Sequence, residues 1–346
     1  MPASKDTAIA AGHDAMLWQA LDGQKVQCEL CGHRCEIAAG KYGICRVREN
    51  CAGMLKTHNY HAIVALNVDP IEKKPLFHFL PGTRSLSVAA AGCNFQCDFC
   101  QNWQISQSPR MGGISGEAVS PEQIVSATRT YDCPSISYTY TEPTVFFELA
   151  YDTCRLAHEG GIKNCFVSNG FMSPLAVEKI APHLDGINVD LKSFRDETYR
   201  QHMKASLRPV LDCLRAMVAA GVWVEVTTLV VPGMNDSAEE LGDIAGFIAG
   251  DLGPQVPWHI TRFHADYRMT SVAATPLETL QMATQIGVKA GLSYVYCGNV
   301  PGQADERTRC PSCQEVLIDR WGFTIRQSNL TAGACPKCGT KIAGVW

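Results

Sequence analysis

Long apolar runs, a secretion signal and an excess of basic residues are all missing from this 346-residue sequence. No apolar run reaches the roughly 18 residues that a membrane-spanning helix needs. The opening segment, MPASKDTAIAAGHDAMLW, lacks a basic stretch followed by an apolar one. The net charge of −4 provides no electrostatic footprint for nucleic acid. We therefore expect a cytoplasmic protein with no membrane partner, and the composition gives no indication of a nucleic-acid partner.

Cysteine, in contrast, is abundant, with 17 residues in a chain that is 46% hydrophobic and long enough for a large core. In a short secreted chain such a number would indicate disulfides, but here most cysteines stand at the spacings of metal ligands. The isolated ones are expected to be small buried apolar residues, and they are Cys133, Cys154, Cys165, Cys213 and Cys297.

The last cysteines form two pairs, CPSC at 310–313 and CPKCG at 335–339, separated by a segment that suits a β-hairpin. This spacing is typical of the two knuckles of a zinc ribbon. Four thiolates close a tetrahedral site, so the expected role of the zinc is structural. The sequence therefore predicts a zinc ribbon over residues 304–346, with the ligands Cys310, Cys313, Cys335 and Cys338.

The first cysteines, in CELCGHRC and KYGICRVREN, predict an N-terminal cysteine-rich module over residues 1–80. Their irregular spacing suits either zinc or an iron-sulfur cluster. Structural zinc is favoured, because Cys-x2-Cys-Gly is a common zinc-knuckle turn. The ligands of this second metal site are expected to be Cys28, Cys31, Cys35 and Cys45, with Cys51 nearby.

Between these ends, β and α patterns alternate, which predicts parallel strands joined by crossover helices. Helical patterns include SPEQIVSATRTY, which opens with Ser-Pro, and SAEELGDIAGFIAG, which opens with a Ser-x-x-Glu capping box. We expect a partial TIM-like (β/α) barrel over residues 81–303. The expected strands lie at 85–92, 135–141, 164–170, 186–192, 223–233, 257–264 and 293–300.

Polar or glycine-containing groups follow nearly every expected strand. In a parallel barrel, the carboxyl ends of the strands share one rim, where active sites are built. Because loops are generally polar, a single polar group after a strand does not by itself indicate a functional site. Their joint occurrence beside a cysteine loop predicts a functional rim, formed by Gly92, 141–143, 168–170, 190–192, 232–236 and 262–264.

The stretch AAAGCNFQCDFCQNW places Cys93, Cys97 and Cys100 directly after the first of these strands. Structural zinc sites usually have four protein ligands. Three cysteines indicate either a zinc site completed by a distant residue or a 4Fe–4S cluster with one iron free of protein ligands. The strand before the loop favours the cluster, and its open iron would bind a substrate or cofactor.

This three-cysteine loop resembles that of the radical SAM superfamily, and most closely the pyruvate formate-lyase activating enzymes. The resemblance implies a partial (β/α)6 barrel and an oxidoreductase in which S-adenosylmethionine chelates the open iron. It also implies that the reduced cluster cleaves the cofactor to methionine and a 5′-deoxyadenosyl radical.

The resemblance extends to other segments of the rim. YTEP at 140–143 stands where the family has Gly-Gly-Glu-Pro, which implies that Glu142 accepts the methionine amine. The Asp-Leu-Lys motif implies contacts of Asp190 and Lys192 with the ribose and carboxylate ends, and LVVPG at 229–233 resembles the adenine-contacting strand. The cofactor-binding residues that the resemblance implies are Phe99, Glu142, Asn169, Asp190, Lys192 and His264.

Over essentially the whole chain, segments such as CELCGHRCEIAAGKYGICRVREN, YTEPTVFFE and IAGVW are similar to AmmeMemoRadiSam system radical SAM enzymes. That similarity implies Memo-like and AMMECR-type partner proteins, besides an electron donor such as flavodoxin or ferredoxin. The substrate is unknown. The favoured prediction is hydrogen abstraction from a small molecule in the barrel mouth. The alternatives are a glycine of a partner protein and a non-catalytic iron-sulfur scaffold, the latter weakened because such centres normally have four protein ligands.

Overall fold

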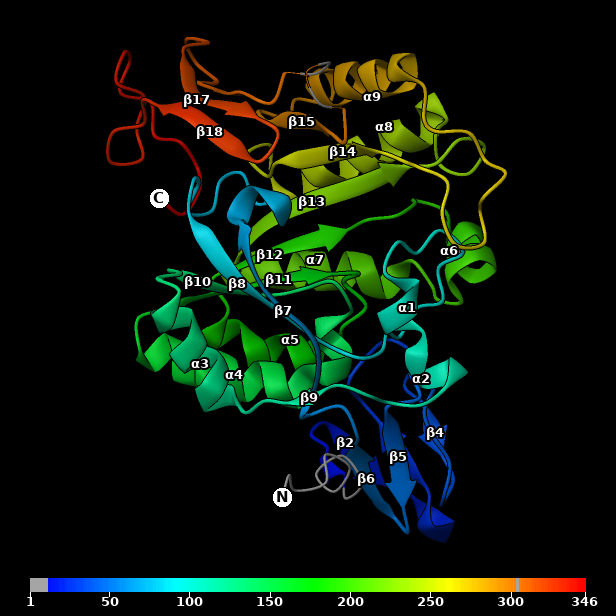
Figure 1. The fold of residues 1–346 in the computed structure, drawn as a ribbon. Coiled ribbons are helices and arrows are strands. Elements are labelled where there is room, and N and C mark those ends of the chain that lie inside the picture. Colours follow the sequence, from blue (N-terminus) through cyan, green and yellow to red (C-terminus); the bar gives the residue numbers. More distant parts are fainter. Residues whose placement is uncertain (1–11, 301, 303–304) are drawn as a thin grey trace.

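The computed structural model describes residues 12–300, 302 and 305–346, and it shows three regions (Figure 1). A module of short strands near the N-terminus lies beside a half-open barrel. A second small module, formed by the C-terminal segment, lies at the opposite end of the barrel strands. Each helix in the described residues is too short or too polar to cross a bilayer.

The N-terminal module consists of two small antiparallel sheets with the strand orders β1-β6-β5 and β2-β3-β4. Its strands contain two to four residues each, so its core is small and includes Val26, Ile37, Val47 and Leu55. The strands are β1 (His13–Asp14), β2 (Trp18–Ala20), β3 (Val26–Cys28), β4 (Glu36–Ile37), β5 (Arg48–Cys51) and β6 (Met54–Thr57).

The central sheet has the order β15-β14-β13-β12-β11-β10-β8-β7-β9, in which the strands from β8 to β15 run parallel. All seven expected strands are confirmed, and β15 follows the sixth β/α unit of the partial barrel. The edge strand β7 pairs antiparallel with β8. The strands are β7 (Ala62–Pro70), β8 (Arg84–Ala90), β9 (Glu117–Ala118), β10 (Ser135–Tyr138), β11 (Lys163–Ser168), β12 (Gly186–Asp190), β13 (Trp223–Val230), β14 (Trp258–Arg262) and β15 (Val295–Gly298).

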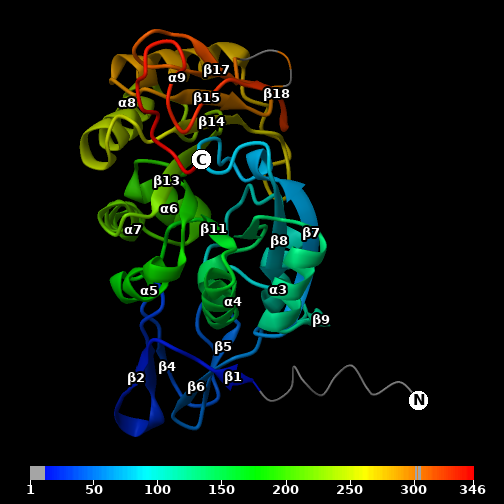
Figure 2. The ribbon, with the colours of Figure 1, turned by 90° about the vertical axis from the view of Figure 1, so that its left-hand side faces the viewer.

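Crossover helices cover the outer side of the sheet, and Figure 2 shows α5, α7 and α8 on one side of the strands with β7 on the other. Short helices follow the cysteine loop, and a 3-10 turn at Pro143–Phe146 follows β10. The helices are α1 (Trp103–Ser106), α2 (Ser108–Met111), α3 (Pro121–Thr130), α4 (Phe147–Glu159), α5 (Pro174–Ile180), α6 (Asp196–Met203), α7 (Arg208–Ala219), α8 (Ala238–Phe247) and α9 (Leu277–Lys289).

The starts of two helices test the expected caps. Ser120 caps α3 with a complete capping box to Gln123. Ser237 caps α8 by accepting from the backbone N–H of Glu240, as the Ser-x-x-Glu pattern predicts. The Glu240 carboxylate, however, accepts from Ser193 Oγ and Phe194 N instead of returning to the cap. Only one of the two hydrogen bonds of the capping box is therefore formed, and the carboxylate of Glu240 joins α8 to the loop after β12.

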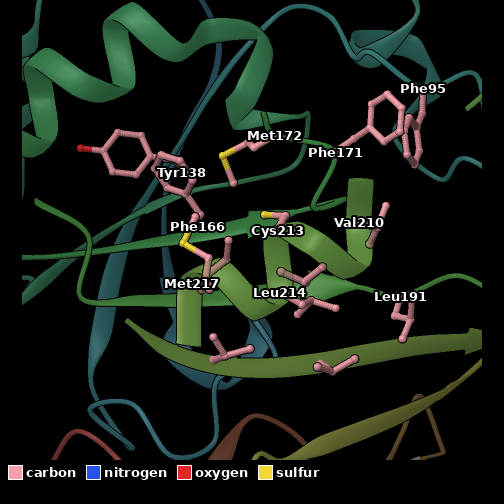
Figure 3. Packing of buried hydrophobic residues seen from close by; sticks show 14 of the residues in the cluster. Phe95, Tyr138, Phe166, Phe171, Met172, Leu191, Val210, Cys213, Leu214 and Met217 are labelled. Carbon is pink, nitrogen blue, oxygen red and sulfur yellow. The ribbon is translucent and has the colours of Figure 1, made fainter. Parts of the chain in front are cut away.

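A continuous apolar core lies between the sheet and the helices, and Figure 3 shows part of it around Phe166 and Leu214. Phe95 of the cysteine loop packs edge-on against Phe171, with ring centroids 5.1 Å apart. The isolated cysteines are buried as expected, namely Cys133, Cys154, Cys165, Cys213 and Cys297.

The C-terminal module contains the expected hairpin, β17 (Val316–Trp321) and β18 (Thr324–Ser328), preceded by β16 (Thr308–Arg309). It lies against the amino ends of the barrel strands, opposite α1 and α6 in Figure 1. Backbone hydrogen bonds join Leu80 N to Val345 O (2.7 Å) and Val345 N to His78 O (2.7 Å). The module therefore closes the end of the barrel that lies away from the cysteine loop.

Candidate functional site

The three cysteines of the predicted cluster lie on the loop that follows β8. Gly92 begins this loop with a φ of +115°, a conformation that favours glycine. A Cβ at this position would lie 2.9 Å from Val47 Cγ1 of the N-terminal module. The loop therefore starts at a contact between barrel and module that leaves room only for glycine.

The end of α6 supports the backbone of the cysteine loop. Gln96 N donates to Met203 O (3.0 Å), and Asp98 N donates to His202 O (3.0 Å). On the other side, Arg110 Nη2 donates to Cys93 O (2.9 Å). These contacts hold the loop in place through its backbone and leave the cysteine thiols available for ligation.

The thiols themselves lie in a largely buried setting. Phe95 N donates to Cys93 Sγ (3.3 Å), and Cys100 Sγ lies 3.3 Å from Ser106 Oγ. Burial raises the pKa of the Cys97 thiol to about 12, although the Lys192 ammonium acts in the opposite direction. A free Cys97 thiol is therefore protonated at neutral pH, and coordination to a metal is what deprotonates such a group.

Glu142 joins the ends of β10 and β11 and is 2% exposed. Its Oε1 accepts from Thr144 N (3.0 Å), Thr144 Oγ1 (2.6 Å) and Ser168 Oγ (2.8 Å), and its Oε2 accepts from Asn169 N (2.8 Å). Burial raises the pKa of Glu142, and these hydrogen bonds oppose the rise. Three of these donors share Oε1, whereas Oε2 has one donor among the described residues. Oε2 therefore has acceptor capacity for a further donor, such as an ammonium group.

Tyr140 occupies the position of the first glycine in the family's Gly-Gly-Glu-Pro segment. It has a φ of +62°, so the backbone keeps a conformation that favours glycine. Its hydroxyl donates to Asp69, Lys74 Nζ lies 4.5 Å from its ring centroid, and Asn102 Nδ2 donates to its carbonyl (2.8 Å). These contacts hold a conformation that typically costs about 1–3 kcal/mol outside glycine.

Asn169 brings the end of β11 to the cysteine loop. Its Nδ2 donates to Asn94 Oδ1 (2.7 Å) and lies 3.8 Å from Cys93 Sγ. Its Oδ1 accepts from Phe171 N (3.0 Å), which fixes the side chain. The structure therefore places Asn169, one of the residues expected at the cofactor, directly against the first cysteine.

Asp190 and Lys192 form an ion pair at the end of β12, with Lys192 Nζ 2.8 Å from Asp190 Oδ2. Lys192 Nζ also lies 5.8 Å from the centroid of the Phe99 ring. Burial disfavours the charge of Lys192, but Asp190 and Cys97 together raise its pKa. A permanently cationic side chain therefore stands between the second cysteine and an acidic side chain.

Asn235 is a rim residue whose role the sequence analysis missed. It lies after β13, beyond the LVVPG segment, and is 1% exposed. Its Nδ2 donates to Lys192 O (2.7 Å) and Leu229 O (2.9 Å), and its Oδ1 accepts from Val231 N (2.7 Å). Its position in the polar group 232–236 was visible in the sequence, but its bond to the end of β12 was not.

His264 stands apart from the other predicted rim residues. It is exposed on the loop after β14, and this loop reaches the cysteine loop through other residues. Arg268 N donates to Asp98 O (3.0 Å), and the ring of Tyr267 stacks on Trp103 with centroids 5.1 Å apart. The structure therefore brings Phe99, Glu142, Asn169, Asp190 and Lys192 to the cysteine loop. Among the described residues, no hydrogen bond or ion pair joins His264 to them.

The C-terminal cysteines are grouped tightly. The four sulfur atoms all lie within 4.8 Å of one another, with 3.5 Å between Cys310 and Cys338 and 3.7 Å between Cys313 and Cys335. Zinc bound by four thiolates at about 2.3 Å in a tetrahedron places the sulfurs about 3.8 Å apart. The geometry of this group is therefore suited to a single zinc ion.

Comparison with known proteins gives the same assignment for the barrel. The model of the radical SAM superfamily matches residues 88–247. An uncharacterized protein of Methanocaldococcus jannaschii, MJ0808, is 44% identical over 331 residues, covering 95% of this chain and 98% of that protein. This chain belongs to the radical SAM superfamily. A pyruvate formate-lyase-activating enzyme of Clostridium pasteurianum is 24% identical over 214 residues, which cover 57% of this chain and 87% of the enzyme.

A solved structure supports the radical SAM fold independently. A radical SAM methyltransferase from Sphaerobacter thermophilus matches with a TM-score of 0.50 at 17% identity, covering 64% of this chain and 68% of the methyltransferase. Radical SAM proteins use a 4Fe–4S cluster and S-adenosylmethionine. The donor set here fits both groups, because three thiols on one loop border an acidic, a cationic and an amide side chain.

Proposed function

We propose that this protein holds a site-differentiated 4Fe–4S cluster on Cys93, Cys97 and Cys100, and that it cleaves S-adenosylmethionine reductively. The radical formed would abstract hydrogen from a small-molecule substrate. The observation that carries the proposal is the convergence of three strand ends on the cysteine loop. They contribute Glu142, Asn169 and the pair Asp190 and Lys192. When bound, the cluster and cofactor together supply the radical chemistry.

The side chains have distinct roles in this proposal. Glu142 Oε2, which keeps a free acceptor site, binds the amine of the cofactor through a charge-assisted hydrogen bond. Lys192, whose pKa is raised by Asp190 and Cys97 despite burial, binds the carboxylate end. Asp190 accepts from a ribose hydroxyl, and Phe99 lies beside the adenine. Asn169 orients the first cysteine.

Polar side chains inside the barrel, below the rim, favour a polar small molecule as substrate. Tyr140 on the rim donates to Asp69 of β7, and Asp69 pairs with the buried Lys74 at 2.6 Å. Ser87 Oγ of β8 also donates to Asp69, at 2.9 Å. A wall with fixed charges and hydroxyls recognises a polar ligand by a few placed contacts.

A glycine of a partner protein is the second candidate target. Its support is the similarity to pyruvate formate-lyase-activating enzyme and to a (2S)-3-sulfopropanediol dehydratase activating enzyme of Klebsiella oxytoca, which is 24% identical over 115 residues. Either target needs a one-electron donor such as flavodoxin or ferredoxin. Memo-like and AMMECR-type partners stay a prediction from the sequence resemblance.

Anaerobic turnover with labelled extract tests the proposal and separates the two targets. Cluster-loaded protein, reduced with dithionite, should release 5′-deoxyadenosine and methionine. Extract from cells grown in D2O would be separated into a low-mass fraction and a protein fraction. Each fraction would then be added separately to the reduced, cluster-loaded protein. Deuterium in 5′-deoxyadenosine with the low-mass fraction supports a small-molecule substrate, and deuterium with the protein fraction alone supports a protein target. No cleavage by loaded protein would contradict the whole assignment.

A further inference from the structure

The four N-terminal cysteines surround a void between the N-terminal module and the barrel. The cavity between them has a volume of about 20 Å³. Barrel residues Asn94 and Val145 form part of the wall, so the void lies at the junction of both regions. The cysteines that line it are Cys28, Cys31, Cys35 and Cys45.

The spacing of these sulfurs differs from that of a zinc site. Among the described residues, potential ligands gather within 4.8 Å of one another in the C-terminal group and in Glu49, Cys51 and His58. No three sulfurs of the four N-terminal cysteines gather in this way, and neither do those of Cys93, Cys97 and Cys100. A cubane cluster binds each thiolate to a different iron, which holds the sulfurs farther apart than a single zinc does. The four N-terminal cysteines therefore resemble Cys93, Cys97 and Cys100 in the wide spacing of their sulfurs.

Polar groups suited to a cluster line the same void. Arg48 is 1% exposed, pairs with Glu148, and donates to Cys28 Sγ at 3.3 Å. Asn94 is fully buried, and its Nδ2 has no hydrogen-bond partner among the described residues. Donors of this kind stabilise iron-sulfur clusters and tune their reduction potentials.

We propose that Cys28, Cys31, Cys35 and Cys45 hold a second 4Fe–4S cluster, with a protein thiolate on every iron. The irregular sequence spacing left zinc and iron-sulfur open, and the separation of the four sulfurs around one cavity points to the cluster. Because all four irons have protein ligands, this cluster has no open site for S-adenosylmethionine. Its presence goes beyond the proposed function and does not depend on it.

The second cluster lies next to the cysteine loop of the first. His33, another lining residue, has Nε2 2.9 Å from Asn94 O, and Asn94 Oδ1 lies 3.8 Å from Cys93 Sγ. A backbone hydrogen bond from Gly32 N to Phe171 O (3.0 Å) joins the module to the rim. A single residue thus separates the two groups of ligands. The second cluster would take one electron from a low-potential donor protein and pass it to the first, without any bond change of its own.

Metal analysis of a variant that lacks the first cluster tests the site. The triple variant Cys93→Ala, Cys97→Ala, Cys100→Ala, reconstituted anaerobically as the full chain, should keep about four irons as well as one zinc, and wild type should hold about eight irons. An iron-free triple variant with two zincs would overturn the proposal. Because this variant has no S-adenosylmethionine chemistry, the result is independent of the proposed function.

Matched cysteine variants locate the iron within the N-terminal module. Cys31→Ser with Cys35→Ser, added to the triple variant, should remove the remaining iron and keep the zinc. Cys51→Ser is the control, since Cys51 belongs to β5 of the same module but does not line the void. Loss of iron in the control, or retention in the Cys31 and Cys35 variant, would contradict the ligand assignment. If that variant fails to fold, the metal content of the triple variant still decides.

Electron paramagnetic resonance tests the adjacency of the clusters. Fully reduced wild type should give a spectrum broadened by spin coupling, whereas the triple variant should give one sharp signal that added S-adenosylmethionine does not alter. Two unbroadened, independent signals in wild type would overturn the electron relay.

Discussion

Each end of the barrel contains a buried glutamate that accepts hydrogen bonds from several segments, and the two sites differ in what they leave open. At the carboxyl end, Glu142 uses one oxygen fully and keeps a free acceptor site on the other. At the amino end, Glu225 accepts two bonds on each oxygen. Its donors are His78 N (2.8 Å), Trp223 Nε1 (3.0 Å), Phe77 N (3.0 Å) and His259 Nε2 (2.7 Å).

The pKa values of the two glutamates shift in opposite directions. Burial raises the pKa of Glu142. Burial acts in the same sense on Glu225, but the hydrogen bond and charge of His259 outweigh it and lower the pKa of Glu225. Glu225 is thus a saturated anion, and Arg320 of the C-terminal module donates to the carbonyl of Phe77, one of its donor residues. The comparison indicates that the amino end is built for stability and the carboxyl end for binding, as in other β/α barrels.

Removing the cysteines at the carboxyl end should produce the largest functional change. Cys93→Ala, Cys97→Ala and Cys100→Ala should each abolish formation of 5′-deoxyadenosine, because two thiolates do not retain the cluster properly. Cys133→Ala, at the amino end before β10, is the control and should keep cleavage. Chromatographic assay of 5′-deoxyadenosine checks the outcome, and residual cleavage in any of the three variants would refute the ligand assignment.

Local patterns explain how much of the carboxyl end was predictable. Each strand has its own β pattern, and the cysteines lie on one short loop, so Cys93, Cys97 and Cys100 could be placed without knowing any distant contact. Parallel topology then implied that the strand ends share a rim. Asp190 and Lys192 were found for this reason, because only Leu191 separates them in the sequence and they stand at the end of β12.

Contacts between distant segments explain what was not predictable. Glu225 binds two backbone N–H groups about 150 residues earlier, with separations of 148 and 147 residues, and no periodic pattern encodes such pairs. Tyr140 has a glycine-like φ, and its contacts with Asp69, Lys74 and Asn102 all come from other segments. His264 was proposed from a motif alone, and its exposure depends on the path of a loop that has no regular pattern.

Removing the carboxylate at the amino end should produce the largest loss of stability. Glu225→Ala leaves four buried donors without an acceptor, and removing one partner of a buried charged pair typically costs about 3–5 kcal/mol. Anaerobic denaturant unfolding, followed by circular dichroism, measures the free energy of unfolding. Glu239→Ala, an 86% exposed side chain, is the control and should change stability by less than about 0.5 kcal/mol. Equal losses in both variants would end the distinction between the two ends of the barrel.

The amino end should also make stability depend on pH. Burial lowers the pKa of His78 to about 4, so the folded protein keeps this ring neutral where an unfolded chain, with a pKa of about 6.5, protonates it. The contribution is complete above about pH 6.5 and is lost as pH falls toward 4, up to about 3 kcal/mol. His78→Gln should flatten the decline measured by thermal unfolding between pH 7 and 5, whereas His264→Gln should leave it unchanged. An identical pH profile in wild type and His78→Gln would contradict this account.

The smallest expected effects concern the affinity for S-adenosylmethionine at the carboxyl end. Losing a charge-assisted contact costs about 1.5–3 kcal/mol, or roughly tenfold to a hundredfold in affinity. Glu142→Gln, Asp190→Asn and Lys192→Met should therefore keep their iron and bind the cofactor more weakly by that factor.

Asp190→Asn is the most informative of the three variants. Glu142 also joins two strand ends, so its substitution can lower stability as well as affinity. The Asp190 side chain is 36% exposed, so its substitution should affect mainly the affinity. Asp212→Asn, in the exposed pair with Arg208 on α7, is the control and should bind as wild type does. Titration of the cofactor against the paramagnetic signal of the cluster measures each affinity. Wild-type affinity in all three rim variants would leave the cysteine loop as the cluster site but remove these strand ends from the cofactor. Weaker binding in Asp190→Asn with unchanged stability would show that the carboxyl end, unlike the amino end, holds its charges for a ligand.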